Sequence, residues 1–116
     1  MLSNRVMPDQ ATNANTGKKA AFIWYHADTQ LVDVLHAWVS KMGESEGISS
    51  RLMVRRQAER TTFMEIYEVS GSLDMEDVVE SIERNAATQP WFTQLYGPRK
   101  AEIFVEVLAQ PAPSVS

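Results

Sequence analysis

The chain has 116 residues, of which 44% are hydrophobic, with a formal net charge of −4 at pH 7 and no cysteine. This length holds one ordinary globular domain and leaves no room for a second core. The lack of cysteine excludes disulfides, thiol nucleophiles and thiolate metal sites, and it fits a reducing compartment. Basic residues are scattered among more numerous acids, which disfavours a surface that follows nucleic acid phosphates.

The sequence shows neither a secretion signal nor a membrane span. Residues 1–19 contain no continuous apolar segment. No later run approaches the roughly 18 apolar residues that a membrane-crossing helix needs. We therefore expect a cytoplasmic protein with no membrane partner and no nucleic acid partner.

Composition predicts three regions. Residues 1–19 are rich in Asn, Thr, Ser and Gln, and we expect them to form a flexible N-terminal arm. Residues 110–116 contain two prolines, which interrupt strand pairing, and we expect them to form a C-terminal tail. The single folded domain is predicted to span residues 20–109.

The domain is predicted to begin with a strand and a helix. Residues 20–27 are apolar on both alternating faces, as expected for an inner strand. Asp28 or Thr29 can cap the following helix by accepting a hydrogen bond from a first-turn N–H group. Gly43 and Gly47 are two possible ends of that helix. Its apolar stripe consists of Leu31, Leu35, Trp38 and Met42.

A hairpin and a second helix follow. Residues 50–56 and 61–69 are predicted strands, joined by a short polar turn. Ser72 is a candidate N-cap for the second helix, whose apolar residues recur at helical spacing. That apolar face consists of Met75, Val78, Val79, Ile82 and Ala86.

A short helix and a last strand end the predicted domain. Pro90 begins one to two helical turns, and Gly97 with Pro98 ends them. The aromatic residues of this short helix are expected to cover part of the core. Residues 101–108 have the alternation of a strand.

The order strand, helix, strand, strand, helix, strand is typical of a ferredoxin-like βαββαβ sandwich, an α+β fold. Right-handed crossovers and the hairpin favour an antiparallel sheet of strand order 4-1-3-2, with both helices on one face. The side chains that we expect to face the helices are Ile23, Tyr25, Leu52, Val54, Met64, Ile66, Ile103, Val105 and Val107.

The sheet face away from the helices is the predicted site. A domain of this size gains stability when a second copy covers an exposed sheet face, so we expect a homodimer. The ligand-binding or interface candidates on this face are Trp24, His26, Arg55, Phe63, Glu65, Tyr67, Phe104 and Glu106.

These candidates allow two interpretations. If a ligand or a second subunit covers the face, desolvation raises the proton affinity of its carboxylates unless a cation such as Arg55 pairs with them, and acid–base chemistry becomes possible. The interpretation that we favour is that the polar groups face water or form ion pairs at a dimer contact. No residue is assigned a catalytic role.

No metal or cofactor site is predicted. His26 and His36 are isolated, and the HxH, HxxxH and HExxH spacings do not occur. The glycines form no phosphate-binding cluster. RNA-recognition domains also use aromatic residues on such a sheet, but the strand 61–69 lacks the basic and glycine positions of their signature.

Two parts of the chain resemble a known family. The segment 62–68 (TFMEIYE), and the segment 96–99 (YGPR) followed by 102–104 (EIF), resemble a family of short uncharacterised proteobacterial proteins. The layout is also similar to dimeric α/β-barrel proteins, including small antibiotic-biosynthesis-type monooxygenases and haem-degrading enzymes. That resemblance implies a dimeric α/β barrel, in which two subunits pack sheet against sheet. No motif here matches a catalytic motif of those enzymes, so no catalytic residue is carried over.

Two functions follow as hypotheses. The first is a homodimeric small-molecule-binding or interaction module without demonstrated catalysis, with a small aromatic ligand as a candidate partner. The second is a cofactor-independent oxygenase or related enzyme acting on an aromatic or polyketide-like substrate, with His26, Glu65 and Tyr67 lining its cavity.

Overall fold

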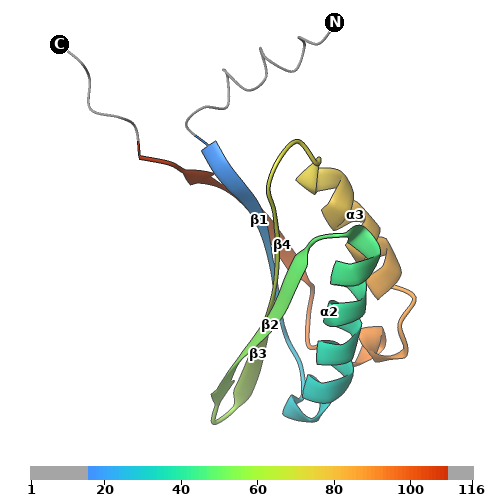
Figure 1. The fold of residues 1–116 in the computed structure, drawn as a ribbon. Coiled ribbons are helices and arrows are strands. Elements are labelled where there is room, and N and C mark those ends of the chain that lie inside the picture. Colours follow the sequence, from blue (N-terminus) through green and yellow to red (C-terminus); the bar gives the residue numbers. More distant parts are fainter. Residues whose placement is uncertain (1–15, 110–116) are drawn as a thin grey trace, which may run out of the picture.

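The computed structural model describes residues 16–109, which form a four-stranded antiparallel sheet with two helices on one face (Figure 1). The strand order is β2-β3-β1-β4, so the predicted ferredoxin-like order and α+β class are confirmed. The elements are β1 (Thr16–His26), η1 (Thr29–Leu31), α2 (Val32–Glu46), β2 (Ser49–Gln57), β3 (Arg60–Val69), α3 (Met75–Ala86), η2 (Pro90–Gln94) and β4 (Lys100–Val107).

Strand β1 begins earlier than the composition suggests. Lys19 pairs with Val69 of β3 and with Val105 of β4, so residues 16–19, predicted as part of the arm, belong to the sheet. Backbone hydrogen bonds form this ladder, and they do not depend on apolar side chains. The rest of the predicted arm, residues 1–15, and the predicted tail, residues 110–116, lie outside the described residues.

The first helical segment has a clear start and end. The side chain of Asp28 accepts a hydrogen bond from the Gln30 backbone N–H at 2.8 Å, which confirms one of the two predicted caps. Gly47 has a φ of 72° and ends α2, as a left-handed C-cap glycine does. Gly43, the other predicted end, lies inside α2, where a Cβ would collide with the side chain of Ser50. This glycine permits close packing of α2 against the start of β2.

The N-cap of the second helix lies two residues after the predicted one. Asp74, not Ser72, is the N-cap of α3, because its carboxylate accepts hydrogen bonds from the N–H groups of Glu76 (3.0 Å) and Asp77 (3.4 Å). A carboxylate also interacts favourably with the positive end of the helix dipole. The predicted apolar face is confirmed: Met75, Val78, Ile82 and Ala86 are buried and Val79 is half-buried.

The core lies between the sheet and the helices. Its largest apolar members from the strands are Ile23 and Tyr25 of β1 and Phe63 and Tyr67 of β3. Leu35, Trp38 and Val39 of α2, Val78 and Ile82 of α3, and Trp91 of η2 pack against them. The aromatic start of η2 is therefore part of the core, as predicted.

The predicted facing of β3 is wrong. Residues opposite each other in an antiparallel ladder share a face, and Phe63 is opposite the buried Tyr25 while Glu65 is opposite the buried Ile23. Phe63, Glu65 and Tyr67 therefore lie beneath the helices. Met64 and Ile66, which we expected there, lie on the open face of the sheet.

The remaining strands face as predicted, but β4 is not buried. Ile103 and Val105 are opposite Ala21 and Lys19 and so share the helix side of the sheet, yet they are exposed. Val107, at the end of β4, is 85% exposed. The end of β4 runs past the helices (Figure 1), which explains why its helix-side residues are uncovered.

Within residues 16–109, no helix combines the length and apolarity that crossing a membrane requires.

Candidate functional site

The eight candidate residues divide between the two faces of the sheet. Trp24, His26, Arg55, Phe104 and Glu106 belong to the open face, because each alternates with residues on the helix side. Phe63, Glu65 and Tyr67 lie under the helices and are 0% exposed. The predicted single site therefore becomes two separate groups of side chains.

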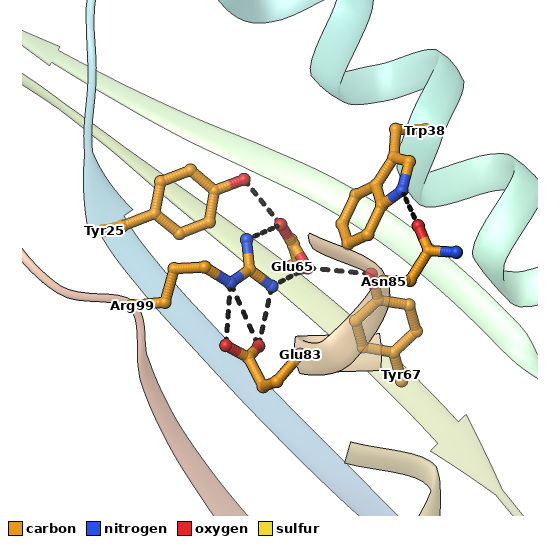
Figure 2. Close-up of polar contacts among 7 residues, drawn as sticks. All are labelled: Tyr25, Trp38, Glu65, Tyr67, Glu83, Asn85 and Arg99. Carbon is orange, nitrogen blue, oxygen red and sulfur yellow. Dashed lines mark hydrogen bonds and ion pairs between the residues drawn. The ribbon is translucent and has the colours of Figure 1, made fainter. Parts of the chain in front are cut away.

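Glu65 is the centre of a hydrogen-bonded group beneath the helices (Figure 2), which we call the Glu65 network. Its Oε2 accepts from the hydroxyl of Tyr25 at 2.6 Å, and its Oε1 accepts from the hydroxyl of Tyr67 at 2.8 Å. Arg99 donates from Nη1 to Oε2 at 2.8 Å and from Nη2 to Oε1 at 3.0 Å. Each carboxylate oxygen thus accepts two hydrogen bonds, which satisfies its two acceptor positions.

Arg99 joins this carboxylate to a second one. Its Nε donates to both oxygens of Glu83 at 3.0 Å, and its Nη2 donates to Glu83 Oε2 at 2.8 Å. The side chain of Arg99 is 2% exposed, whereas that of Glu83 is 33% exposed. Glu83 therefore connects the buried guanidinium to the solvent side of α3.

Aromatic rings surround the guanidinium. Its central carbon lies 4.9 Å from the ring centroid of Tyr25, 5.4 Å from that of Trp38 and 5.9 Å from that of Trp91. These distances are within the range of cation–π attraction. Trp38 also donates from Nε1 to Asn85 Oδ1 at 2.8 Å. The rings thus replace part of the hydration that Arg99 loses on burial.

The surroundings of Tyr25, Tyr67 and Arg99 shift the pKa values of all three side chains. Burial, the charge of Glu65 and the hydrogen bond to Glu65 all raise the pKa of Tyr25 and of Tyr67 far above the ordinary tyrosine value. Burial alone lowers the pKa of Arg99, but its hydrogen bonds and charge interactions with Glu65 and Glu83 raise it above its ordinary value. Both tyrosines therefore stay neutral donors and Arg99 stays charged near neutral pH.

Sequence reasoning missed the partner of Glu65. Neither Arg99, which the sequence shows only within the segment 96–99 (YGPR), nor Glu83 is among the predicted candidates. A usable signal was present, because a strand as aromatic and apolar as β3 that carries one acid among its inward positions requires a cation nearby.

The open face consists of cross-strand rows that the ladder register defines. One row runs Met53, Met64, Trp24, Lys100 across the four strands, and the next runs Arg51, Ile66, Phe22, Glu102. A shorter row contains Arg55, Thr62 and His26. Apolar and aromatic side chains thus occupy the centre of these rows, and Arg51, Lys100 and Glu102 occupy their ends. Glu68 of the inner strand β3 is a further charged group on this face.

Direct contacts order several of these side chains. The rings of Phe22 and Phe104 meet edge-on with centroids 5.6 Å apart, and the Lys100 ammonium lies 5.1 Å from the ring centroid of Trp24. His26 Nδ1 and Thr62 Oγ1 are 3.0 Å apart, within hydrogen-bond distance. No element of residues 16–109 covers this centre, because both helices lie on the other side (Figure 1).

The hollows of the surface lie elsewhere. The largest, about 640 Å³, is an open groove between the end of α2 and the strands β2 and β3, lined by serines together with Glu44 and Glu68. None of the eight candidates lines it. Among the described residues, no group of three or more His, Asp or Glu side chains is arranged to hold a metal ion.

Comparison with known proteins identifies the fold and no family. No protein-family model matches the chain, and no curated protein sequence matches it. Among solved structures, the chain is similar to the de novo designed protein Foldit4, with a TM-score of 0.58 and 12% identity over 79% of this chain and 99% of that one. At this identity the likeness shows the fold alone: a ferredoxin-like α+β sheet with two helices.

Proposed function

We propose that the protein is a homodimeric interaction module whose binding surface is the open face of the sheet. One observation carries the proposal: the centre of this face is apolar and aromatic, yet no helix or strand of residues 16–109 covers it, although Ile66 itself is only 4% exposed. Met53 is 55% exposed and Phe104 is 56% exposed, and Phe22, Trp24 and Met64 are half-buried around them. Such a patch with a polar rim is typical of protein–protein contacts.

The size of the face suits a second copy. Four strands at a spacing of about 4.8 Å, over a ladder about 25 Å long, give roughly 500 Å² of flat surface. Two such faces bury about 1,000 Å², without the extra area of protruding side chains. An area of about 1,000 Å² is the level that a specific interface needs. Face-to-face packing of two sheets is also a common way to form a core.

The enzyme hypothesis has less support. His26 lies on the open face, whereas Glu65 and Tyr67 lie under the helices, so the three groups predicted for an oxygenase do not line one cavity. Glu65 has all its acceptor positions filled by Tyr25, Tyr67 and Arg99. A small aromatic ligand between two open faces stays a prediction, as do the cytoplasmic location and the relationship to the proteobacterial family.

The proposal is tested by sedimentation velocity of the full chain. We expect a dimer at micromolar concentration, and we expect Met64→Asp to raise the dissociation constant at least about tenfold because a carboxylate at the centre of the contact loses its hydration. Val34→Asp is the control, since Val34 is 46% exposed on α2 and away from the open face. A monomeric wild-type chain, or a folded Met64→Asp variant that dimerises as well as wild type, would overturn the proposal.

A further inference from the structure

One row of the open face has opposite charges at its two ends. Arg51 and Arg55 lie on β2, the strand at one edge, and Glu102 lies on β4, the strand at the other, where Lys100 of the neighbouring row lies against the ring of Trp24. The ladder register places Arg51, Ile66, Phe22 and Glu102 in a single row across the sheet. This row is cationic at one end, apolar in its centre and anionic at the other end.

Two symmetric arrangements bring two such faces together. A two-fold axis parallel to the strands lays β2 of one copy over β4 of the other, and it keeps each row facing the same row. A two-fold axis that is perpendicular to the strands and parallel to the sheet lays each strand over the same strand of the other copy. Closed dimers use one such axis, so the charges at the edges can distinguish the two arrangements.

From this charge pattern, and resting on the proposed function, we infer that the two copies pack with β2 over the partner's β4, so that Arg51 of each copy pairs with Glu102 of the other. In the alternative arrangement, with the axis through this row, Arg51 would face the partner's Arg51 and Glu102 would face the partner's Glu102. Like charges in a contact oppose association. The parallel axis converts the same four charged groups into two ion pairs.

The neighbouring side chains fit the same arrangement. In the row of Arg51 and Glu102, Ile66 faces the partner's Phe22, so apolar groups meet apolar groups. In the next row, Met64 faces the partner's Trp24, a favourable sulfur–aromatic pair. Aligned sheets cross at about 30°, and this angle leaves the contacts in the row of Arg51 and Glu102 in place.

Arg51 can reach a second copy. In the single chain it lies 3.5 Å from Glu68, and its side chain is 58% exposed. An exposed ion pair of this kind is weak and its geometry adapts readily. Arg51 can therefore keep Glu68 on one side while it gains Glu102 of the partner on the other.

Charge reversal tests the inference directly. We expect Arg51→Glu alone and Glu102→Arg alone each to raise the dimer dissociation constant at least about tenfold, because each creates two like-charge contacts per dimer. The double variant restores both pairs and should dimerise within about threefold of wild type. Mixing the two single variants should give a heterodimer, whereas mixing wild type with the double variant should leave two separate homodimers.

Cysteine cross-linking supplies a second measurement, since the natural chain contains no cysteine. Positions 51 and 102 of one chain lie on opposite edges of the sheet, three strand spacings or about 14 Å apart, which is too far for a disulfide within the chain. We expect oxidation of mixed Arg51→Cys and Glu102→Cys chains to give a covalent heterodimer. Covalent dimers of Arg51→Cys alone would instead support the perpendicular axis.

The outcomes separate this inference from the proposed function. If wild type dimerises and Met64→Asp weakens it, but both single charge reversals bind as tightly as wild type, the inferred pairing of β2 with β4 is wrong and the interaction module stands. If wild type is a monomer, both are wrong. Heterodimers of wild type with the double variant would also contradict the pairing.

Discussion

The two faces of this sheet place charge in opposite ways. Beneath the helices, Glu65 and Arg99 are 0% and 2% exposed, and every hydrogen-bonding position of the Glu65 carboxylate is filled from within the chain. On the open face, most charged groups lie on the edge strands, and apolar side chains occupy the centre. Satisfied buried charge defines one conformation of the chain, whereas an uncovered apolar surface is typical of an interaction site.

The Glu65 network connects distant parts of the chain. Tyr25 comes from β1, Glu65 and Tyr67 from β3, Glu83 from α3, and Arg99 from the segment after η2 (Figure 2). Removing both ions in favour of apolar groups can be neutral, whereas removing one leaves the other buried without its partner. The network is thus expected to be sensitive to single substitutions, and the open face tolerant of them.

The largest effect is expected from Arg99→Met. Methionine keeps most of the side-chain volume but removes the charge, so Glu65 stays buried with no cation, at a cost of about 3–5 kcal/mol in unfolding free energy. Urea denaturation measures this loss. Arg84→Met is the control, because the Arg84–Glu80 pair is exposed and should contribute less than about 1 kcal/mol. A loss below about 1 kcal/mol for Arg99→Met would show that the tyrosines suffice for Glu65.

Alkaline pH should destabilise the helix-covered face next most strongly. The folded-state pKa values of Tyr25 and Tyr67 are raised, so above pH about 10 the unfolded chain loses protons that the folded chain keeps. Below that pH the two tyrosines make their full contribution to stability. Above it, as pH rises, the two tyrosines together should lower the unfolding free energy by about 2.7 kcal/mol per pH unit. Urea denaturation between pH 9 and 11.5 measures the slope. The slope should disappear in a chain carrying both Tyr25→Phe and Tyr67→Phe; a slope unchanged in that variant would contradict this assignment.

A single lost hydroxyl should cost less. Tyr67→Phe removes one hydrogen bond to the buried Glu65 carboxylate, and a bond to a charged acceptor contributes about 1.5–3 kcal/mol. Thermal and urea unfolding measure the change. Tyr96→Phe provides the comparison, since Tyr96 is 63% exposed and should change stability by less than about 0.5 kcal/mol. Equal effects of the two substitutions would remove the distinction between the network and the surface.

The smallest effect on folding should come from the open face. Phe104→Ser removes a ring that is 56% exposed, so the unfolding free energy of the monomer should change by less than about 1 kcal/mol. Dimerisation of the same variant should weaken. Sedimentation velocity measures this weakening, and the unfolding data measure the stability of the monomer. If Phe104→Ser instead unfolds the monomer, the centre of this face belongs to the core of the single chain.

Strand β3 shows why its inward face could not be read from its sequence. One alternating set contains Phe63, Glu65 and Tyr67, and the other contains Met64, Ile66 and Glu68. Each set has one acid among large apolar groups, so alternation alone does not distinguish which set faces the core. The structure buries the set whose acid pairs with a buried cation, Arg99, 34 residues further along the chain. Glu68, the acid of the other set, pairs with the exposed Arg51.

The sequence alone determined the order of the elements, the strand order of the sheet, the hairpin, the buried stripe of α3 and the absence of cysteine chemistry, because these follow from local periodicity and from the handedness of short connections. Only the tertiary structure decided that Phe63, Glu65 and Tyr67 lie beneath the helices and that Met64 and Ile66 lie on the open face. Those placements depend on pairing a buried carboxylate with a guanidinium distant in sequence. The desolvation of an unpaired charge outweighs the small difference in apolarity between the two faces of one strand.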